Sequence, residues 1–107
     1  MPQSKTIIEL EKERMQWALA TFPKSTAISS LRKLEREIEE IEVDIIEGYK
    51  NPTEYADALM CLFDSAGRHG ITVEEIFEAF ETKLAINKTR AWIKNDDNSY
   101  SHVKSAS

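Results

Sequence analysis

Several features are scarce in this 107-residue sequence, and each scarcity excludes a class of protein. A single cysteine, Cys61, excludes a disulfide bond within the chain, and its apolar setting ALMCLF favours a buried residue over a reactive thiol. No run of roughly 18 apolar residues is present, and the stretch MPQSKTIIELEKERM lacks the hydrophobic segment of a signal peptide, so we expect a cytoplasmic protein that does not enter a membrane. The chain has fourteen basic and nineteen acidic residues, and the resulting net charge of -5 argues against general nucleic-acid binding.

Glycine and proline are also scarce, with three residues of each, and strand signals are nearly absent. Together with 41% hydrophobic and 31% charged residues, this composition favours a small domain built from long helices. Capping signals divide the chain into four expected helices. They run from Thr6 to the break at Pro23, from the turn FPKSTA to Gly48, from Asn51 and Pro52 to Gly67, and from Thr72 towards Trp92.

Short connections between these helices predict an all-α, four-helix-bundle-like fold. We expect one all-helical domain over residues 1–94, followed by a polar, mobile tail over residues 95–107, because NDDNSYSHVKSAS has few core formers. The third helix is apolar almost all round from Tyr55 to Ala66, so we expect it to be buried on most sides.

The second helix carries an unusual concentration of acid. Residues 34–44 read LEREIEEIEVD and hold six carboxylates. An apolar seam through Leu34, Ile38 and Ile41 divides them into two flanks, and only Lys33 and Arg36 are near enough in sequence to compensate. One flank holds Glu37, Glu40 and Asp44, and the other holds Glu35, Glu39 and Glu42. Taken singly, each glutamate fits a solvated surface.

A second pair of acids on the third helix changes this interpretation. Glu37 and Glu40 lie one turn apart, and so do Glu54 and Asp57. Glu54 and Asp57 could serve only the N-terminus of their helix, and Asp64 further along either supports them or faces a basic group. If the two pairs meet across antiparallel neighbours, however, a hard cation such as Mg²⁺ or Mn²⁺ is expected between them.

The fourth helix adds a basic stripe. Lys83, Asn87 and Arg90 follow a spacing of four and three residues, so they share one face. Beside a carboxylate-bound cation this stripe suits a polyphosphate, whose oxygens accept hydrogen bonds from such groups. The alternative is an ordinary solvated helix end, where cations are favoured by the helix dipole.

The chain resembles the MazG-like all-α nucleoside triphosphate pyrophosphohydrolases, and within them the phage and prophage dATP/dGTP pyrophosphohydrolase group. The resemblance covers most of the chain. It rests on Glu37-x-x-Glu40, thirteen intervening residues and Glu54-x-x-Asp57, together with QWALATFP, EYADALMCLFDSAGRHGI and KLAINKTRAW. The E-x-x-E half alone has little weight, since Glu39-x-x-Glu42 also satisfies it.

The resemblance implies hydrolysis of a (deoxy)nucleoside triphosphate, with dATP and dGTP as candidate substrates, to the monophosphate and pyrophosphate. It implies Mg²⁺, or Mn²⁺, held by Glu37, Glu40, Glu54 and Asp57. Glu40 or Glu37 would be the catalytic base, and we favour Glu40. Lys83, Asn87, Lys88 and Arg90 would contact the triphosphate; Trp17 and Trp92 would stack on the base unless they serve a core or an interface. The resemblance also implies a homo-oligomer, a dimer or tetramer.

One alternative comes from a different class of protein: a non-catalytic helical phage adaptor that binds a protein partner through its acidic face. The sequence leaves open the preferred base, the number of metal ions, and whether the role is pool control or removal of damaged nucleotides.

Overall fold

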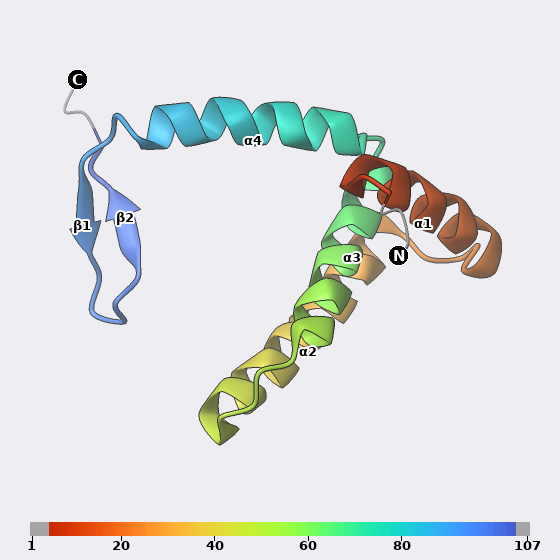
Figure 1. The fold of residues 1–107 in the computed structure, drawn as a ribbon, viewed down its shortest axis with the longest axis horizontal. Helices are drawn as coiled ribbons and strands as arrows, with labels where there is room; N and C mark the ends of the chain where they lie inside the picture. Colours follow the sequence, from red (N-terminus) through yellow and green to blue (C-terminus); the bar gives the residue numbers. More distant parts are fainter. Residues whose placement is uncertain (1–4, 105–107) are drawn as a thin grey trace. The chain divides into compact units, whose positions relative to one another are not determined.

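The structure, a computed structural model, describes residues 5–104 and confirms the predicted all-α class, with four helices. The elements are α1 (Ile7–Thr21), α2 (Ala27–Glu47), α3 (Pro52–Arg68), α4 (Val73–Asn87), β1 (Trp92–Lys94) and β2 (Tyr100–His102), as drawn in Figure 1. The chain divides into two compact units between Glu75 and Ile76. Across residues 5–104, no helix combines the length and the apolar character needed to cross a membrane.

The helices begin where the capping signals predict. The Thr6 side chain accepts from the Glu9 backbone, and the Glu9 side chain accepts from the Thr6 backbone, so α1 opens with a capping box. Thr72 and Glu75 form the same arrangement before α4. At α3 the Asn51 side chain accepts from the Thr53 backbone at 3.1 Å, and no capping box with Glu54 forms. The carboxylate of Glu54 is therefore not needed to start α3.

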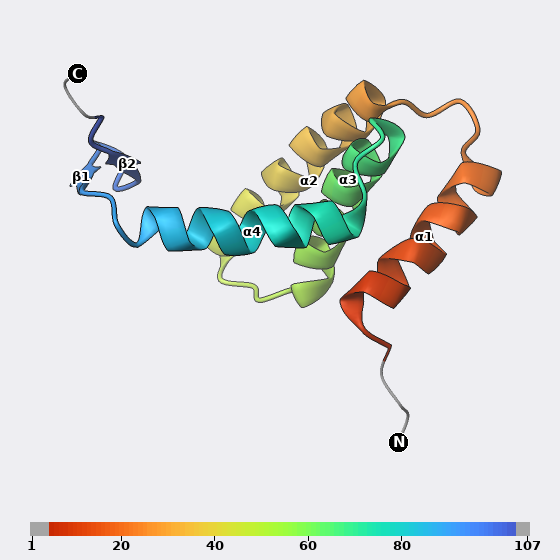
Figure 2. The ribbon, with the colours of Figure 1, turned by 90° about the horizontal axis from the view of Figure 1, so that it is seen from above.

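A short turn joins α2 to α3 and makes them antiparallel neighbours. Gly48 ends α2 with φ at 82°, a left-handed conformation that glycine adopts without strain. Figures 1 and 2 both show α2 and α3 side by side and running in opposite directions. The acidic flank of α2 therefore lies next to the N-terminal half of α3.

The first helix is held against α3 by close packing and by an ionic network. A β-carbon at Gly67 would lie 2.7 Å from Sδ of Met15, so the absence of a side chain makes room for the Met15 side chain of α1 against α3. Arg14 donates to Asp64 at 3.0 Å, and Arg68 donates to the same carboxylate at 2.7 Å. Ser30 of α2 donates to Asp64 at 2.5 Å, so one buried carboxylate joins three helices. Asp64 thus faces basic groups, one of the two roles expected for it.

The expectation that α3 is buried on most sides is wrong for the single chain. Tyr55, Leu59, Met60 and Leu62 are each at least 44% exposed. The reason is that α1 and α2 cover only one side of α3 in the first unit. An apolar stripe of the first unit therefore faces outward.

The second unit contains most of α4 and a β-hairpin. α4 ends at Asn87 and does not continue towards Trp92, which instead begins β1. β1 pairs antiparallel with β2, with Trp92 opposite His102, and Asn98 takes a positive φ of 71° in the turn. Residues 100–102 of the expected polar tail form β2, because polar turn residues close a hairpin there. Residues 105–107 of that tail lie outside the described residues.

Candidate active site

Glu37 is the most buried carboxylate of the acidic flank. It is 4% exposed, and Lys33, one turn earlier on α2, donates to its Oε1 at 2.7 Å. This hydrogen bond is the main reason that the pKa of Glu37 lies below its ordinary value. Its other oxygen, Oε2, is buried without a hydrogen-bond donor, although the carboxyl group of Glu40 lies within hydrogen-bonding reach.

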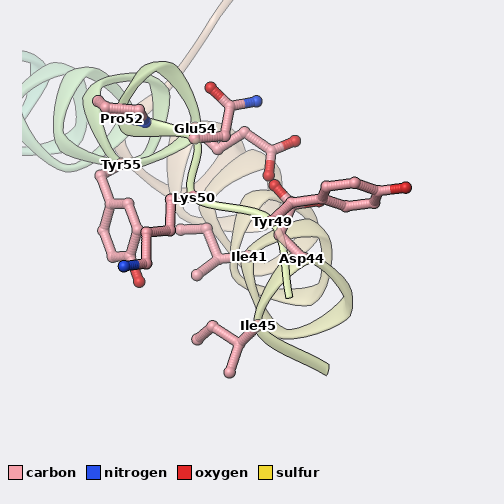
Figure 3. Close-up of a pocket in the computed structure, with 9 residues that line it drawn as sticks. Ile41, Asp44, Ile45, Tyr49, Lys50, Pro52, Glu54 and Tyr55 are labelled. Carbon is pink, nitrogen blue, oxygen red and sulfur yellow. The ribbon is translucent and has the colours of Figure 1, made fainter. Parts of the chain in front are cut away.

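Glu54 lies in a similar position on α3, facing Asp44 of α2. Contact between the two carboxyl groups, then burial, then the negative charges of Asp44, Glu40 and Glu37 raise the pKa of Glu54 to about 7. Its Oε2 is also buried without a donor. Figure 3 shows Glu54 and Asp44 among the residues that line a pocket of about 420 Å³ at the α2–α3 turn.

These contacts bring Glu37, Glu40, Asp44 and Glu54 into one electrostatic cluster. Each unpartnered oxygen has another carboxyl group as its neighbour, and a carboxyl group donates only when protonated. Such oxygens fit a divalent cation, which satisfies several carboxylates at once. Among residues 5–104, no three His, Cys, Asp or Glu side chains already form a set that could hold a metal ion. The ion pair of Lys33 with Glu37 and the raised pKa of Glu54 both reduce the negative charge of the cluster.

Asp57 lies one turn beyond Glu54 and faces a different hollow. It lines a cavity of about 560 Å³ together with Glu37, Lys33 and Trp17. The indole of Trp17 is 58% exposed and meets the ring of Phe22 edge-on at 5.3 Å between ring centres. The first unit therefore combines two of the predicted acids with an exposed aromatic ring in one cavity.

The remaining predicted site residues belong to the second unit. Trp92 donates from its indole nitrogen to the Asn87 carbonyl at 3.1 Å and packs edge-on against His102. Arg90 donates to the side chain of Asn87 at 3.3 Å. Lys83 lines a shallow hollow on α4, and Lys88 is exposed directly after that helix. Asn87 therefore fixes both Trp92 and Arg90 within this unit.

Sequence reasoning neither placed Asp44 beside Glu54 nor paired Lys33 with Glu37. Asp44 shares the flank of Glu37 and Glu40, seven and four residues further along α2, and its helical phase was the available signal. Lys33 precedes Glu37 by four residues, the spacing of a helical ion pair. The opposite flank of α2 is a solvated face. Glu39 and Glu42 are exposed, and Glu35 forms an exposed ion pair with Arg32 at 2.6 Å. None of these three residues is part of the cluster.

Known proteins match this chain along most of its length. A family model described as dATP/dGTP pyrophosphohydrolase covers residues 10–107. A dATP/dGTP diphosphohydrolase of Salmonella phage PMBT28 is 34% identical over 98 residues, which are 92% of this chain and 32% of that protein. A dATP/dGTP diphosphohydrolase of Cyanophage S-2L is 31% identical over 98 residues, which are 92% of this chain and 89% of that protein. This chain thus spans about a third of the first relative and most of the second.

A solved structure is similar as well. It is the Cyanophage S-2L MazG-like pyrophosphohydrolase bound to dGDP and three catalytic Mn²⁺ ions per active site. The TM-score is 0.76 at 30% sequence identity, and the match covers 94% of this chain and 100% of the other. With a family model over residues 10–107 and relatives above 30% identity, this chain belongs to the dATP/dGTP pyrophosphohydrolase family.

Proposed function

We propose that this protein is a metal-dependent pyrophosphohydrolase that converts dATP or dGTP to the monophosphate and pyrophosphate. The observation that carries the proposal is the acidic cluster on α2 and α3, where Glu37 and Glu54 each keep a buried oxygen without a donor. Family membership supports the same reaction. The cyanophage relative supports a purine deoxynucleotide, since it binds dGDP.

Glu37, Glu40, Glu54 and Asp57 would hold the cation, with Asp44 beside Glu54 as a further carboxylate. Mg²⁺ is the ion we propose, and Mn²⁺, which the cyanophage protein binds, would substitute for it. When bound, such an ion stabilises charge on phosphate oxygens and lowers the pKa of a coordinated water.

Glu40 is the general base that we propose. It is exposed, and no lysine or arginine within residues 5–104 forms an ion pair with it, whereas Lys33 pairs with Glu37. An exposed carboxylate beside the cluster is within reach of solvent water and could take a proton from it. Glu37, which is buried, would hold the cation in place beside Glu40.

The nucleotide would be bound by two groups of residues. Trp17 is our candidate for stacking on the base, because it is exposed in the cavity that Asp57 and Glu37 also line. Lys83, Asn87, Lys88 and Arg90 remain candidates for the triphosphate, and Trp92 for the base; their support is the family match, which includes these residues.

We also propose a homo-oligomer, a dimer or tetramer, that works in the cytoplasm. The support for the oligomer is the uncovered apolar stripe of α3, including Leu59 and Leu62. Contiguous exposed apolar surface of this kind typically marks a protein interface.

The test of this function is the release of pyrophosphate, and not orthophosphate, from a panel of dNTPs with and without Mg²⁺ or Mn²⁺. Asp57→Ala and Glu40→Ala should each lower kcat at least about 100-fold while the helical circular dichroism stays unchanged. Glu39→Ala and Glu42→Ala are matched controls, because they remove acids from the solvated flank of the same helix. No metal-dependent turnover by folded protein would overturn the proposal and favour a binding role.

A further inference from the structure

Lys33 forms an ion pair with Glu37, one of the carboxylates that would bind the metal. Its ammonium nitrogen lies 2.7 Å from Oε1 of Glu37. The two partners differ sharply in exposure, since the Lys33 side chain is 54% exposed and that of Glu37 is 5% exposed. An exposed, flexible cation thus covers one oxygen of a buried carboxylate whose other oxygen has no donor.

A divalent cation on Glu37 is incompatible with this ion pair. Two positive charges about 4 Å apart repel strongly in a partly buried site, and a carboxylate bound to a dication is a weaker acceptor for an ammonium group. Lys33 would therefore leave Glu37 when metal arrives. Its unbranched four-carbon stem allows the ammonium group to move without any change in the helix.

The cavity next to Glu37 offers the displaced ammonium group a new position. Lys33 lines it together with Ser29, Arg36 and Asp57. An anion that enters this cavity beside the acidic cluster would meet two basic side chains and a hydroxyl group. Phosphate oxygens accept from such donors.

We propose that Lys33 is an exchangeable counter-ion: it neutralises Glu37 in the metal-free protein and binds a phosphate group of the nucleotide once a cation occupies Glu37. The inference rests on the proposed function and adds a phosphate-contacting residue to it. It makes the cation and the nucleotide mutually dependent, because metal binding alone must break the ion pair, whereas the nucleotide provides a new partner for the released lysine.

Calorimetric titration with Mn²⁺ alone tests the first half. Lys33→Met keeps the stem and removes the charge, so the Kd for Mn²⁺ should fall about three- to tenfold. Arg36→Met is the matched control, because Arg36 lines the same cavity but forms no ion pair within residues 5–104. We expect its Kd to change less than about twofold. An equal fall in the Kd for Mn²⁺ in both variants would show that any loss of positive charge has this effect, and would overturn the inference. An unchanged or higher Kd in Lys33→Met would overturn it as well.

Binding of a nonhydrolysable dATP analogue at saturating Mn²⁺ tests the second half. Lys33→Met should weaken this binding about five- to twentyfold, while Lys33→Arg should retain it within about threefold. Opposite shifts for metal alone and for the nucleotide in one variant are the expected signature, and a purely structural role would not produce them. Wild-type pyrophosphate release without these opposite shifts would overturn only the inference. No wild-type release would overturn the proposed function and the inference together.

Discussion

Glu54 is the residue whose protonation state the fold alters most clearly. Its carboxyl group contacts that of Asp44 and lies near Glu40 and Glu37, and its pKa rises to about 7 from an ordinary 4.5. Near neutral pH the metal-free protein therefore keeps a proton on Glu54 for part of the time. A cation at this position would displace that proton, so metal affinity should increase with pH.

The raised pKa predicts how stability depends on pH in the metal-free protein. Between pH 4.5 and about 7 the folded state binds the Glu54 proton and the unfolded state does not, so stability falls as pH rises through this window. We expect the midpoint of thermal unfolding, measured in EDTA, to fall from pH 5 to pH 8. Glu54→Gln should lose this contribution.

The comparison between wild type and Glu54→Gln isolates the effect. The positive charge of Arg90, then desolvation and the charges of Lys83 and Lys104, lower the pKa of His102, which makes stability rise with pH below about 6.5 in both proteins. The lowered pKa of Glu37 changes the pH dependence of stability only below pH 4.5, the ordinary pKa of a glutamate, which lies outside the range from pH 5 to pH 8. An identical pH profile in the two proteins would show that Asp44 does not raise the pKa of Glu54.

Among the elements, α1, α2 and α3 depend on the network around Asp64. Burial alone would raise the pKa of this carboxyl group, but hydrogen bonds from Ser30, Arg68 and Arg14 together keep the pKa below its ordinary value. Arg68 also donates to the carbonyl of Ala18, and so fixes the end of α1. The position of α1, and with it one wall of the cavity, thus depends on ionic contacts.

Asp64→Ala should therefore destabilise the protein by about 2–4 kcal/mol, because it removes the only carboxylate paired with Arg68 within residues 5–104 and one of the two carboxylates paired with Arg14, the other being Glu11. Urea unfolding followed by circular dichroism measures the change. Glu35→Ala removes an exposed ion pair with Arg32 and should cost less than about 0.5 kcal/mol. A cost for Asp64→Ala no larger than this control would show that the network contributes little.

The elements were largely predictable because their ends are set locally. Thr6, Asn51 and Thr72 cap their helices through groups only two or three residues away, so a short window of sequence contains the signal. The hairpin was missed for the opposite reason. Its pairing joins Trp92 to His102 across polar turn residues, and neither strand is apolar enough to stand out.

The acidic site was predictable only to the level of a helix face. Periodicity placed Glu37, Glu40 and Asp44 on one flank, but which of them meets Glu54 depends on how α2 and α3 pack beyond the Gly48 turn. The pairing of Lys33 with Glu37 also depends on burial, which sequence spacing does not give. Long-range geometry thus accounts for what the sequence left open.

At the scale of the whole molecule, the apolar stripe of α3 is the feature that a single chain leaves unexplained. Leu59 and Leu62 lie three residues apart on this stripe and are 44% and 50% exposed. Full burial of an exposed leucine contributes about 1.5–3 kcal/mol, so covering these half-buried side chains would contribute about 1 kcal/mol each, and a second copy of the chain would gain stability by doing so.

Sedimentation velocity should therefore give a dimer or larger assembly for the wild type. Leu59→Glu should shift the protein towards a smaller species, because it would bury an unpaired charge in the interface. Glu39→Ala, on the solvated flank of α2, should leave the assembly unchanged. A monomeric wild type at micromolar concentration would contradict the proposed oligomer.

Gly67 also has a consequence for ligand size. Its missing side chain makes room for the Met15 side chain of α1, because a β-carbon there would lie 2.7 Å from Sδ of Met15. Two residues after Met15, Trp17 forms part of the cavity wall opposite Asp57 on α3. A bulkier residue at position 67 would first displace the flexible Met15 side chain. If α1 then shifted with it, the wall that carries Trp17 would move as well. The width of the cavity would then change although neither residue 67 nor Met15 lines it.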